Sequence, residues 1–274
     1  MSLTQQDKMI GKHPEEGIFF EWIDSIDTPC TDTKRHRHLF ANEHKNNEAI
    51  ELIANWLVLY HLTDNKKRAL VKKKNILSRY DFRDYASELH ILPTADKTKK
   101  GNLGEIILTE YLSQTTGIDV LVYKLRYNSN VDQSMKGDDV LLVDENRIFL
   151  GESKFRSTPS KKVIEEASKS MKNSLALPIS LGFISDRLFE EGKDELAEKI
   201  LDIQFKLSKS KLNIKNIGFV LSTNSVKDFV EKNMNSSNND FIFISLGIEN
   251  PIVLMESAFK RANDLIMEVD FDET

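Results

Sequence analysis

Carboxylates and a lysine gather in one short stretch of the sequence, residues 137–156. Two acids, Asp138 and Asp139, come directly before an apolar run, and Glu152 and Lys154 end a second apolar run. Carboxylate oxygens are the ligands that hard divalent cations prefer. A metal-activated water with a positive charge beside the attacked phosphate can hydrolyse a phosphodiester. These residue types therefore suggest a metal-dependent phosphodiesterase site.

The two apolar runs predict a β-hairpin that brings the charged residues together. Residues 140–143 and 148–150 are β-prone, and residues 144–146 are typical of a turn. Glu152 and Lys154 are two residues apart, so both side chains leave the same face of the second strand. We expect the charged residues to meet at the end of the hairpin that lies away from the turn.

The register of this hairpin decides which acid faces Glu152. A two-residue loop at 145–146 places Asp139 opposite Glu152, whereas a three-residue loop at 144–146 places Asp138 there. In either register two acids lie with their Cβ atoms about 4.5–5.5 Å apart. Like charges at this distance repel each other, and a bound cation would neutralise them.

A Glu-x-Lys triplet by itself arises by chance about once in a chain of this length. The acids on the paired strand, the two apolar runs and Gly137 before the acids distinguish this triplet from that background. Ser153 points to the opposite face of the strand, where Gly151 leaves room.

Glu105 is a further candidate for the site. It lies in the first turn of a helix expected from Asn102 to Leu112 and ending by Gly117, and Leu108 follows it on the same inward-facing side. A carboxylate on that side is costly to bury without a partner. Glu105 either complements the helix dipole or is the third acid of the site.

Composition limits the class of protein. The 274 residues suit one elaborated domain or two small ones, and 40% are hydrophobic. The sequence lacks an apolar stretch of about 18 residues and a signal-peptide core. A single cysteine, Cys30, fits a reducing compartment, so we expect a cytoplasmic protein.

The net charge of −5 does not by itself indicate a nucleic-acid-binding protein, but basic residues are clustered. Local basic patches can bind phosphates even on an acidic protein. For Lys66 to Lys74, a solvated helix face and a phosphate-binding surface are equally consistent with the sequence. The basic clusters lie at residues 34–38, 66–74, 97–100 and 206–215.

The periodicity of apolar residues predicts a helical N-terminal half and a mixed remainder. Residues 1–43 are expected to be irregular. Besides the helix at 102–117 and the hairpin, the sequence predicts helices at 48–62, 67–89, 161–175, 182–206 and 251–269, and strands at 118–127, 217–222 and 241–248.

This order of elements, with acids on the second strand and Glu-x-Lys on the third, resembles the PD-(D/E)xK restriction-endonuclease-like superfamily over residues 95–222. The segments LHILPTADKTKKGNLGEIILTEYL, MKGDDVLLV and FLGESKFR are similar to the HamA nuclease subunits of Hachiman anti-phage defence systems. The resemblance implies an α/β fold with an αβββαβ core, a mainly helical N-terminal region at 1–94, and a nuclease-like domain at 95–274 with C-terminal additions.

The resemblance also implies roles for individual residues. Asp139, with Asp138 as the alternative, and Glu152 match the metal-binding acids. Lys154 matches the lysine that orients water and stabilises the developing charge, and Glu105 matches the acid of the preceding helix that adds a metal ligand. The proline that usually precedes the first acid is absent, and Gly137 and Asp138 stand there instead.

The implied activity is hydrolysis of DNA with Mg²⁺, for which Mn²⁺ can substitute. The chain lacks a Gly-rich loop ending in Gly-Lys-Ser/Thr and a His-Glu-x-x-His pair, so it is neither a motor nor a zinc hydrolase of that type. The resemblance implies a HamB-like helicase as a separate partner, for which region 1–94 is a candidate contact. The alternatives are a catalytically silent regulatory or DNA-binding subunit and an RNA-directed nuclease.

Overall fold

The computed structural model of the chain describes most of the sequence. Asp138, the alternative metal ligand, lies outside the described residues, and so do Gly137 and parts of three expected helices. The described ranges are residues 3–82, 89–128, 130–133, 139–170, 179–208 and 213–268.

Six strands form one mixed sheet in the order β1-β2-β6-β5-β4-β3. The four inner strands are parallel to one another, and each edge strand is antiparallel to its neighbour. Every residue of β6 is buried, as expected for an inner parallel strand covered on both faces. The strands are β1 Ile23–Asp27, β2 His36–Ala41, β3 Val140–Val143, β4 Arg147–Phe155, β5 Asn213–Ser222 and β6 Phe241–Gly247. The predicted α/β class is confirmed.

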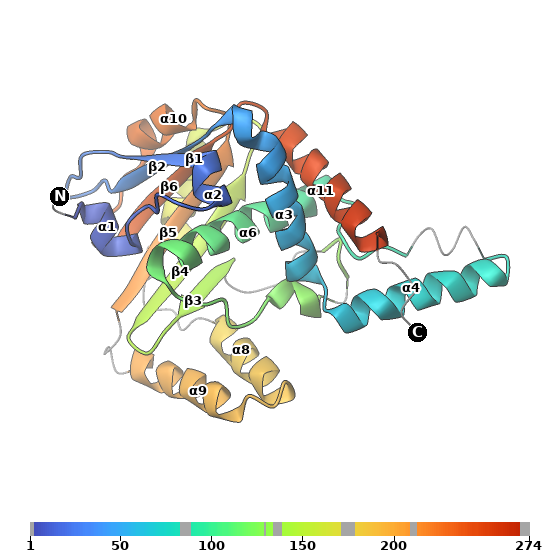
Figure 1. Cartoon of the computed structure of the whole chain (residues 1–274). Coiled ribbons are helices and arrows are strands. Elements are labelled where there is room, and N and C mark those ends of the chain that lie inside the picture. The colour runs from blue at the N-terminus through green and yellow to red at the C-terminus, as the bar shows by residue number, and fades with distance from the viewer. Residues whose placement is uncertain are drawn as a thin grey trace.

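Helices cover both faces of the sheet (Figure 1). On one face α3, α6 and α11 enclose the largest apolar cluster, and on the other face α8–α9 and α7–α10 form two smaller clusters. The helices are α1 Gln5–Ile10, α2 Ile18–Trp22, α3 Asn46–His61, α4 Asp64–Arg79, α6 Asp96–Thr116, α7 Lys161–Ser170, α8 Ile179–Glu190, α9 Asp194–Ser208, α10 Val226–Asn233 and α11 Pro251–Met267, with 3-10 helices η1 Glu43–Lys45 and η2 Lys124–Tyr127.

The expectation that residues 1–43 are irregular was wrong, because this stretch forms α1, α2, β1 and β2. β2 lies between β1 and β6, which buries its basic residues. The imidazoles of His36 and His38 lie 2.8 and 2.9 Å from the Ser245 hydroxyl. Strands from both predicted regions therefore share one sheet, and the boundary between residues 94 and 95 stays a prediction.

The strand predicted at 118–127 was also wrong. Residues 118–123 have no regular secondary structure and residues 124–127 form η2. Val120 and Val122 insert their side chains between α6 and α8 instead of pairing with β3, which stays at the edge of the sheet. Between α6 and α7 the described residues thus form two strands where an αβββαβ core has three, so the restriction-endonuclease-like topology stays a prediction.

Other expected elements agree with the structure in type, but the helix expected at 182–206 is two helices, α8 and α9. The helices expected at 48–62 and 251–269 correspond to α3 and α11, and the strands after the hairpin correspond to β5 and β6. The helix expected at 67–89 ends at Arg79, shortly before Asp81 takes a left-handed backbone conformation with φ of 60°. α10 was not foreseen.

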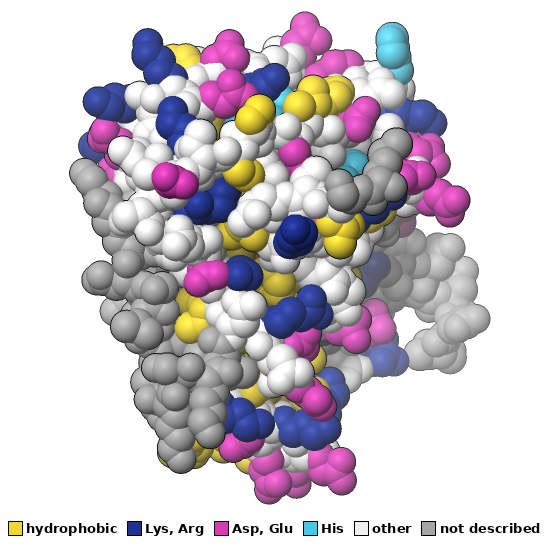
Figure 2. All heavy atoms as spheres, turned by 90° about the vertical axis from the view of Figure 1, so that its left-hand side faces the viewer, with side chains coloured by type: hydrophobic (Ala, Val, Ile, Leu, Met, Phe, Trp, Pro, Cys, Tyr) yellow, Lys and Arg dark blue, Asp and Glu magenta, His cyan; other side chains and the backbone are white. Residues whose placement is uncertain are grey.

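The surface carries charges of both signs. On the face shown in Figure 2, Lys and Arg side chains are interspersed with Asp and Glu rather than gathered into one field. Among the described residues, no helix is both long and apolar enough to span a membrane.

Candidate functional site

The β3–β4 hairpin has the register with a two-residue loop at 145–146. Val140 pairs with Gly151, and one step further along the same ladder Asp139 comes opposite Glu152. Of the two predicted registers, the structure therefore has the one that makes Asp139 the acid facing Glu152.

The charged residues at this end of the hairpin form two contacts. Asp139 Oδ2 accepts a hydrogen bond of 2.9 Å from the backbone N–H of Ser153. Lys154 Nζ donates to Glu152 Oε1, and about a quarter of each of these two side chains is exposed. This ion pair confirms that Glu152 and Lys154 leave the same face of β4. The Ser153 hydroxyl points to the opposite face, toward α6.

Two glycines let α6 approach the hairpin closely. A Cβ atom on Gly104 would lie 2.4 Å from Ser153 Oγ, and one on Gly151 would lie 2.9 Å from Leu108 Cδ2. Such distances are shorter than any ordinary packing contact. The close approach brings Glu105, the residue after Gly104, to the hairpin.

Glu105 lies near the middle of α6 along its length. The helix begins at Asp96, so Glu105 lies in its third turn, and the prediction that it lies in the first turn was wrong. It therefore cannot act as an N-terminal acid that complements the helix dipole, whose effect falls off within one turn. Its predicted inward orientation is confirmed, since only 12% of its side chain is exposed.

Glu105 shares its surroundings with one cation and one further acid. Its Oε1 lies 3.2 Å from Lys124 Nζ. Burial raises the pKa of Glu105 to about 7, the ammonium of Lys124 acts to lower it, and the charge of Asp139 acts to raise it. Asp139 is thus close enough for its charge to influence the ionisation of Glu105.

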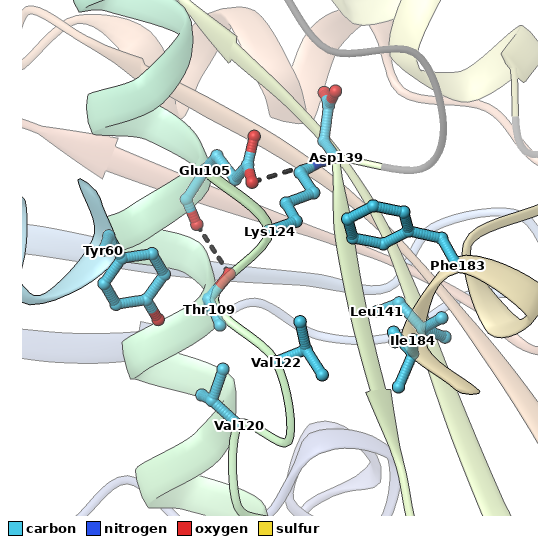
Figure 3. Close-up of a pocket in the computed structure, with 10 residues that line it drawn as sticks. All are labelled: Tyr60, Glu105, Thr109, Val120, Val122, Lys124, Asp139, Leu141, Phe183 and Ile184. Carbon is cyan, nitrogen blue, oxygen red and sulfur yellow. Dashed lines mark hydrogen bonds and ion pairs between the residues drawn. The ribbon is translucent and has the colours of Figure 1, made fainter. Parts of the chain in front are cut away.

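These three side chains lie at one end of a small cavity between α6, β3 and α8 (Figure 3). Val120, Val122 and Leu141 line the other end. The cavity has a volume of about 40 Å³. A water molecule needs about 10–15 Å³ on the same kind of measure, so the space suits an ion or a few waters and excludes a nucleotide base.

The described side chains at this end of the cavity are of the kind that binds a hard cation, but they do not form a complete set of ligands. Glu105 and Asp139 present carboxylate oxygens, and the ammonium of Lys124 shows that this end of the cavity accepts positive charge. Within the part of the chain that the structure describes, however, no group of three or more His, Cys, Asp or Glu side chains is close enough to hold a metal ion. Glu152, the third predicted acid, is paired with Lys154.

Lys124 is the charged residue of the cavity that the sequence interpretation missed. One signal could have found it. Val120, Val122 and Lys124 alternate along the chain, and all three line the cavity. Tyr60 was also missed as a site residue; it lines the cavity from α3 and donates a hydrogen bond of 2.8 Å to Glu110.

Comparison with known proteins identifies the family. A family model described as HamA matches residues 17–262 of the chain. The chain belongs to the HamA family. It is 56% identical to "Hachiman protein HamA" of Bacillus cereus over 270 residues, which cover 98% of this chain and the whole of that protein. The HamA match extends from near the start of α2 into α11 and includes every residue of the candidate site, and the resemblance to HamA inferred from the sequence is confirmed.

Proposed function

We propose that this HamA-family chain is the metal-dependent DNA nuclease of a Hachiman anti-phage defence complex. The observation that supports this most strongly is the convergence of Glu105 and Asp139 in one cavity, with Asp139 opposite Glu152 on the neighbouring strand. Glu105 is a buried acid with a pKa raised to about 7, and it lies next to a second acid. Strongly shifted pKa values of this kind cluster at functional sites.

The proposed metal ligands are Asp139, Glu105 and Glu152. A bound Mg²⁺, or Mn²⁺ in its place, would polarise a phosphate oxygen and lower the pKa of a bound water. The ammonium of Lys154 would stabilise negative charge as it develops on the phosphate. Burial raises the pKa of Glu105 to about 7 in the metal-free protein, so binding of the cation would displace a proton from this carboxyl near neutral pH.

The proposed complex contains a separate HamB-like helicase. This chain has no Gly-rich loop ending in Gly-Lys-Ser/Thr, so energy-driven unwinding has to come from another polypeptide. We further propose that the helicase restrains the nuclease until phage attack, and that the complex acts in the cytoplasm on phosphodiester bonds of DNA.

One observation favours the rival function of a catalytically silent regulatory or DNA-binding subunit. As arranged among the described residues, the acids do not form a three-ligand metal group. The rival requires that the two contacts, Lys124 with Glu105 and Lys154 with Glu152, persist when DNA and Mg²⁺ are present. The proposed nuclease requires that they rearrange.

Nicking of supercoiled plasmid DNA by the complex with Mg²⁺ distinguishes the two functions. We expect Glu152→Ala and Lys154→Ala each to lower the rate by about 100-fold or more, as loss of one group that stabilises transition-state charge does. A matched control is the exposed pair on α7, where Lys161 Nζ lies 3.5 Å from Glu165 Oε1. Lys161→Ala and Glu165→Ala should nick at the wild-type rate. Equal nicking by the two site variants and the wild type would support the silent subunit.

The choice between DNA and RNA is tested separately. Labelled DNA and RNA strands of the same sequence are offered together to the complex with Mg²⁺. We expect the DNA strand to be cut first. Preferential cutting of the RNA strand would instead support the alternative of an RNA-directed nuclease.

A further inference from the structure

α4 is a basic helix that projects from the body of the molecule (Figure 1). Over Asp64–Arg79 it carries seven Lys and Arg residues and one acid, Asp64. Only Val71 is buried. A helix with so little packing is expected to have a role other than filling the core, and its charge suits an anionic partner.

The basic residues of α4 divide between three faces, because residues seven apart lie almost directly above one another on a helix. Lys67 faces α11 and donates a hydrogen bond of 3.0 Å to the carbonyl of Leu265. Arg68 and Lys72 are exposed and do not line any of the described cavities next to α4.

Lys66 and Lys73 form the third face, which looks toward η2. Lys66 Nζ donates to the carbonyl oxygen of Arg126 and lies 5.9 Å from the centroid of the Tyr127 ring. Both lysines line a groove between α4 and η2, to which Arg126 also contributes. We call this the α4–η2 groove.

The α4–η2 groove combines a basic rim with an apolar floor. Its volume is about 300 Å³, at the lower end of the range for sites that hold small organic molecules. The rim carries the three cationic side chains Lys66, Lys73 and Arg126. Apolar residues make up the floor, namely Leu62, Leu70, Ile91, Leu125 and Val131. Phosphate on the rim and a flat base on the floor would match both surfaces.

The groove is also close to the candidate site. Both are built in part by η2, whose first residue, Lys124, reaches Glu105, and whose third residue, Arg126, lines the groove. A strand that follows the groove along η2 would be led toward the cavity that holds Glu105 and Asp139.

We propose that the α4–η2 groove binds a single strand of DNA, with phosphates on Lys66 and Lys73 and an unpaired base on the apolar floor. Positively charged grooves with apolar or aromatic contact surfaces are how proteins bind single strands. A duplex keeps its bases stacked and paired, so it offers the rim its phosphates but offers the floor nothing. This inference deepens the proposed nuclease function, because it names the form of DNA that reaches the site.

The test is binding of the full-length chain, with EDTA present so that no hydrolysis occurs. The probes are a fluorescein-labelled oligothymidine strand of about 20 nucleotides and a labelled duplex of the same length, a span that exceeds one binding site. The variants are Lys66→Ala/Lys73→Ala in the groove and Arg68→Ala/Lys72→Ala on the exposed face. Both remove two positive charges from the same helix.

The groove variant should lose about tenfold in affinity for the single strand, and its slope of log affinity against log salt should fall by about 1.4, or about 0.7 for each lost phosphate contact. The control variant should stay within about twofold of the wild type, which should itself prefer the strand to the duplex. Equal losses in both variants, or equal binding of strand and duplex by the wild type, would overturn the inference.

A melting curve shows whether the groove variant is folded, and Lys73→Ala alone repeats the test because Lys73 is exposed. The outcome is separate from that of the nuclease proposal. If strand binding depends on Lys73 but the complex never nicks DNA, the groove proposal stands and the nuclease proposal fails. If nicking depends on Glu152 but this strand binding is absent, the nuclease proposal stands and the groove proposal fails.

Discussion

The described residues include two buried clusters in which one basic side chain lies beside two carboxylates, and the pKa of one acid is lowered in the first cluster and raised in the second. Both clusters are largely buried, and both join residues that are distant in the sequence. The Arg37 cluster consists of Arg37, Asp7 and Asp27, and the Lys124 cluster consists of Lys124, Glu105 and Asp139.

The Arg37 cluster is saturated with hydrogen bonds. Arg37 is 1% exposed, and its guanidinium has five N–H donors, all of which are used. They donate at 2.7–3.4 Å to oxygens of Asp27, Asp7, Gly11 and Tyr111. Burial acts to raise the pKa of Asp7, but these and neighbouring hydrogen bonds hold it below its ordinary value.

In the Lys124 cluster, the contact with the cation does not offset the cost of burying the Glu105 carboxylate. An ammonium is a point charge without the planar fork of a guanidinium, and the Lys124–Glu105 contact of 3.2 Å does not offset burial. The pKa of Glu105 accordingly rises to about 7. The number and geometry of hydrogen bonds, rather than the count of charges, separate a structural charge cluster from one that is prepared to accept a metal ion or a proton.

The largest effect that tests this comparison is on stability. We expect Arg37→Ala to lower the free energy of unfolding by about 3–5 kcal/mol, because two carboxylates would lose their buried partner. Lys124→Ala should cost about 1 kcal/mol or less at pH 7, since Glu105 can take up a proton instead. Urea denaturation of both variants provides the measurement, and similar losses for the two would remove the distinction between the clusters.

The second effect is the pH dependence of stability without metal. The pKa of Glu105 is about 7 in the fold against its ordinary value of 4.5, so the unfolded chain releases the proton first as the pH rises. The stability from this group is complete below about pH 4.5 and is lost as the pH rises through 7. Between about pH 5 and pH 8, wild type should lose roughly 3 kcal/mol relative to Glu105→Gln, at about 1.4 kcal/mol for each pKa unit.

Urea denaturation in EDTA at several pH values measures this difference. Comparison with Glu105→Gln removes the contribution of other titrating groups, including Glu110, whose pKa is also raised by burial. A difference between the two proteins that stays constant from pH 5 to pH 8 would mean that Glu105 ionises as an ordinary carboxyl.

The smallest of the three effects is stabilisation by a divalent cation. Mg²⁺ at about ten times its dissociation constant should add about 1.4 kcal/mol to the free energy of unfolding of the wild type. Asp139→Asn should abolish this gain, because it removes a proposed ligand. The control is Glu165→Gln, which alters an exposed acid and should keep the gain. Loss of the gain in both variants would point to non-specific screening.

The hairpin could be predicted from the sequence because its signals are local. Asp144 accepts hydrogen bonds from the backbone N–H groups of Asn146 and Arg147, which fixes the turn and therefore the register. The β-prone runs on either side supply the ladder. The inward direction of Glu105 followed in the same way from helical spacing.

The remaining features depend on contacts that are distant in the sequence. β2 looked like a basic cluster because two of its partners, Ser245 and Asp7, lie far from it along the chain. The strand expected at 118–127 had the right residue types, but its apolar side chains fill the space between two helices. Lys124 was missed for the same reason, since its role depends on how closely α6 approaches the hairpin.

The most direct test of the central claim is anomalous diffraction from crystals of the protein soaked in Mn²⁺. The account predicts one strong peak in contact with carboxylate oxygens of Asp139 and Glu105, with Glu152 turned from Lys154 toward the ion, and no peak at the Arg37 cluster. The account would be contradicted by a map without a peak at Asp139 when the same protein nicks DNA in solution. A peak at Asp7 and Asp27 instead would also contradict it.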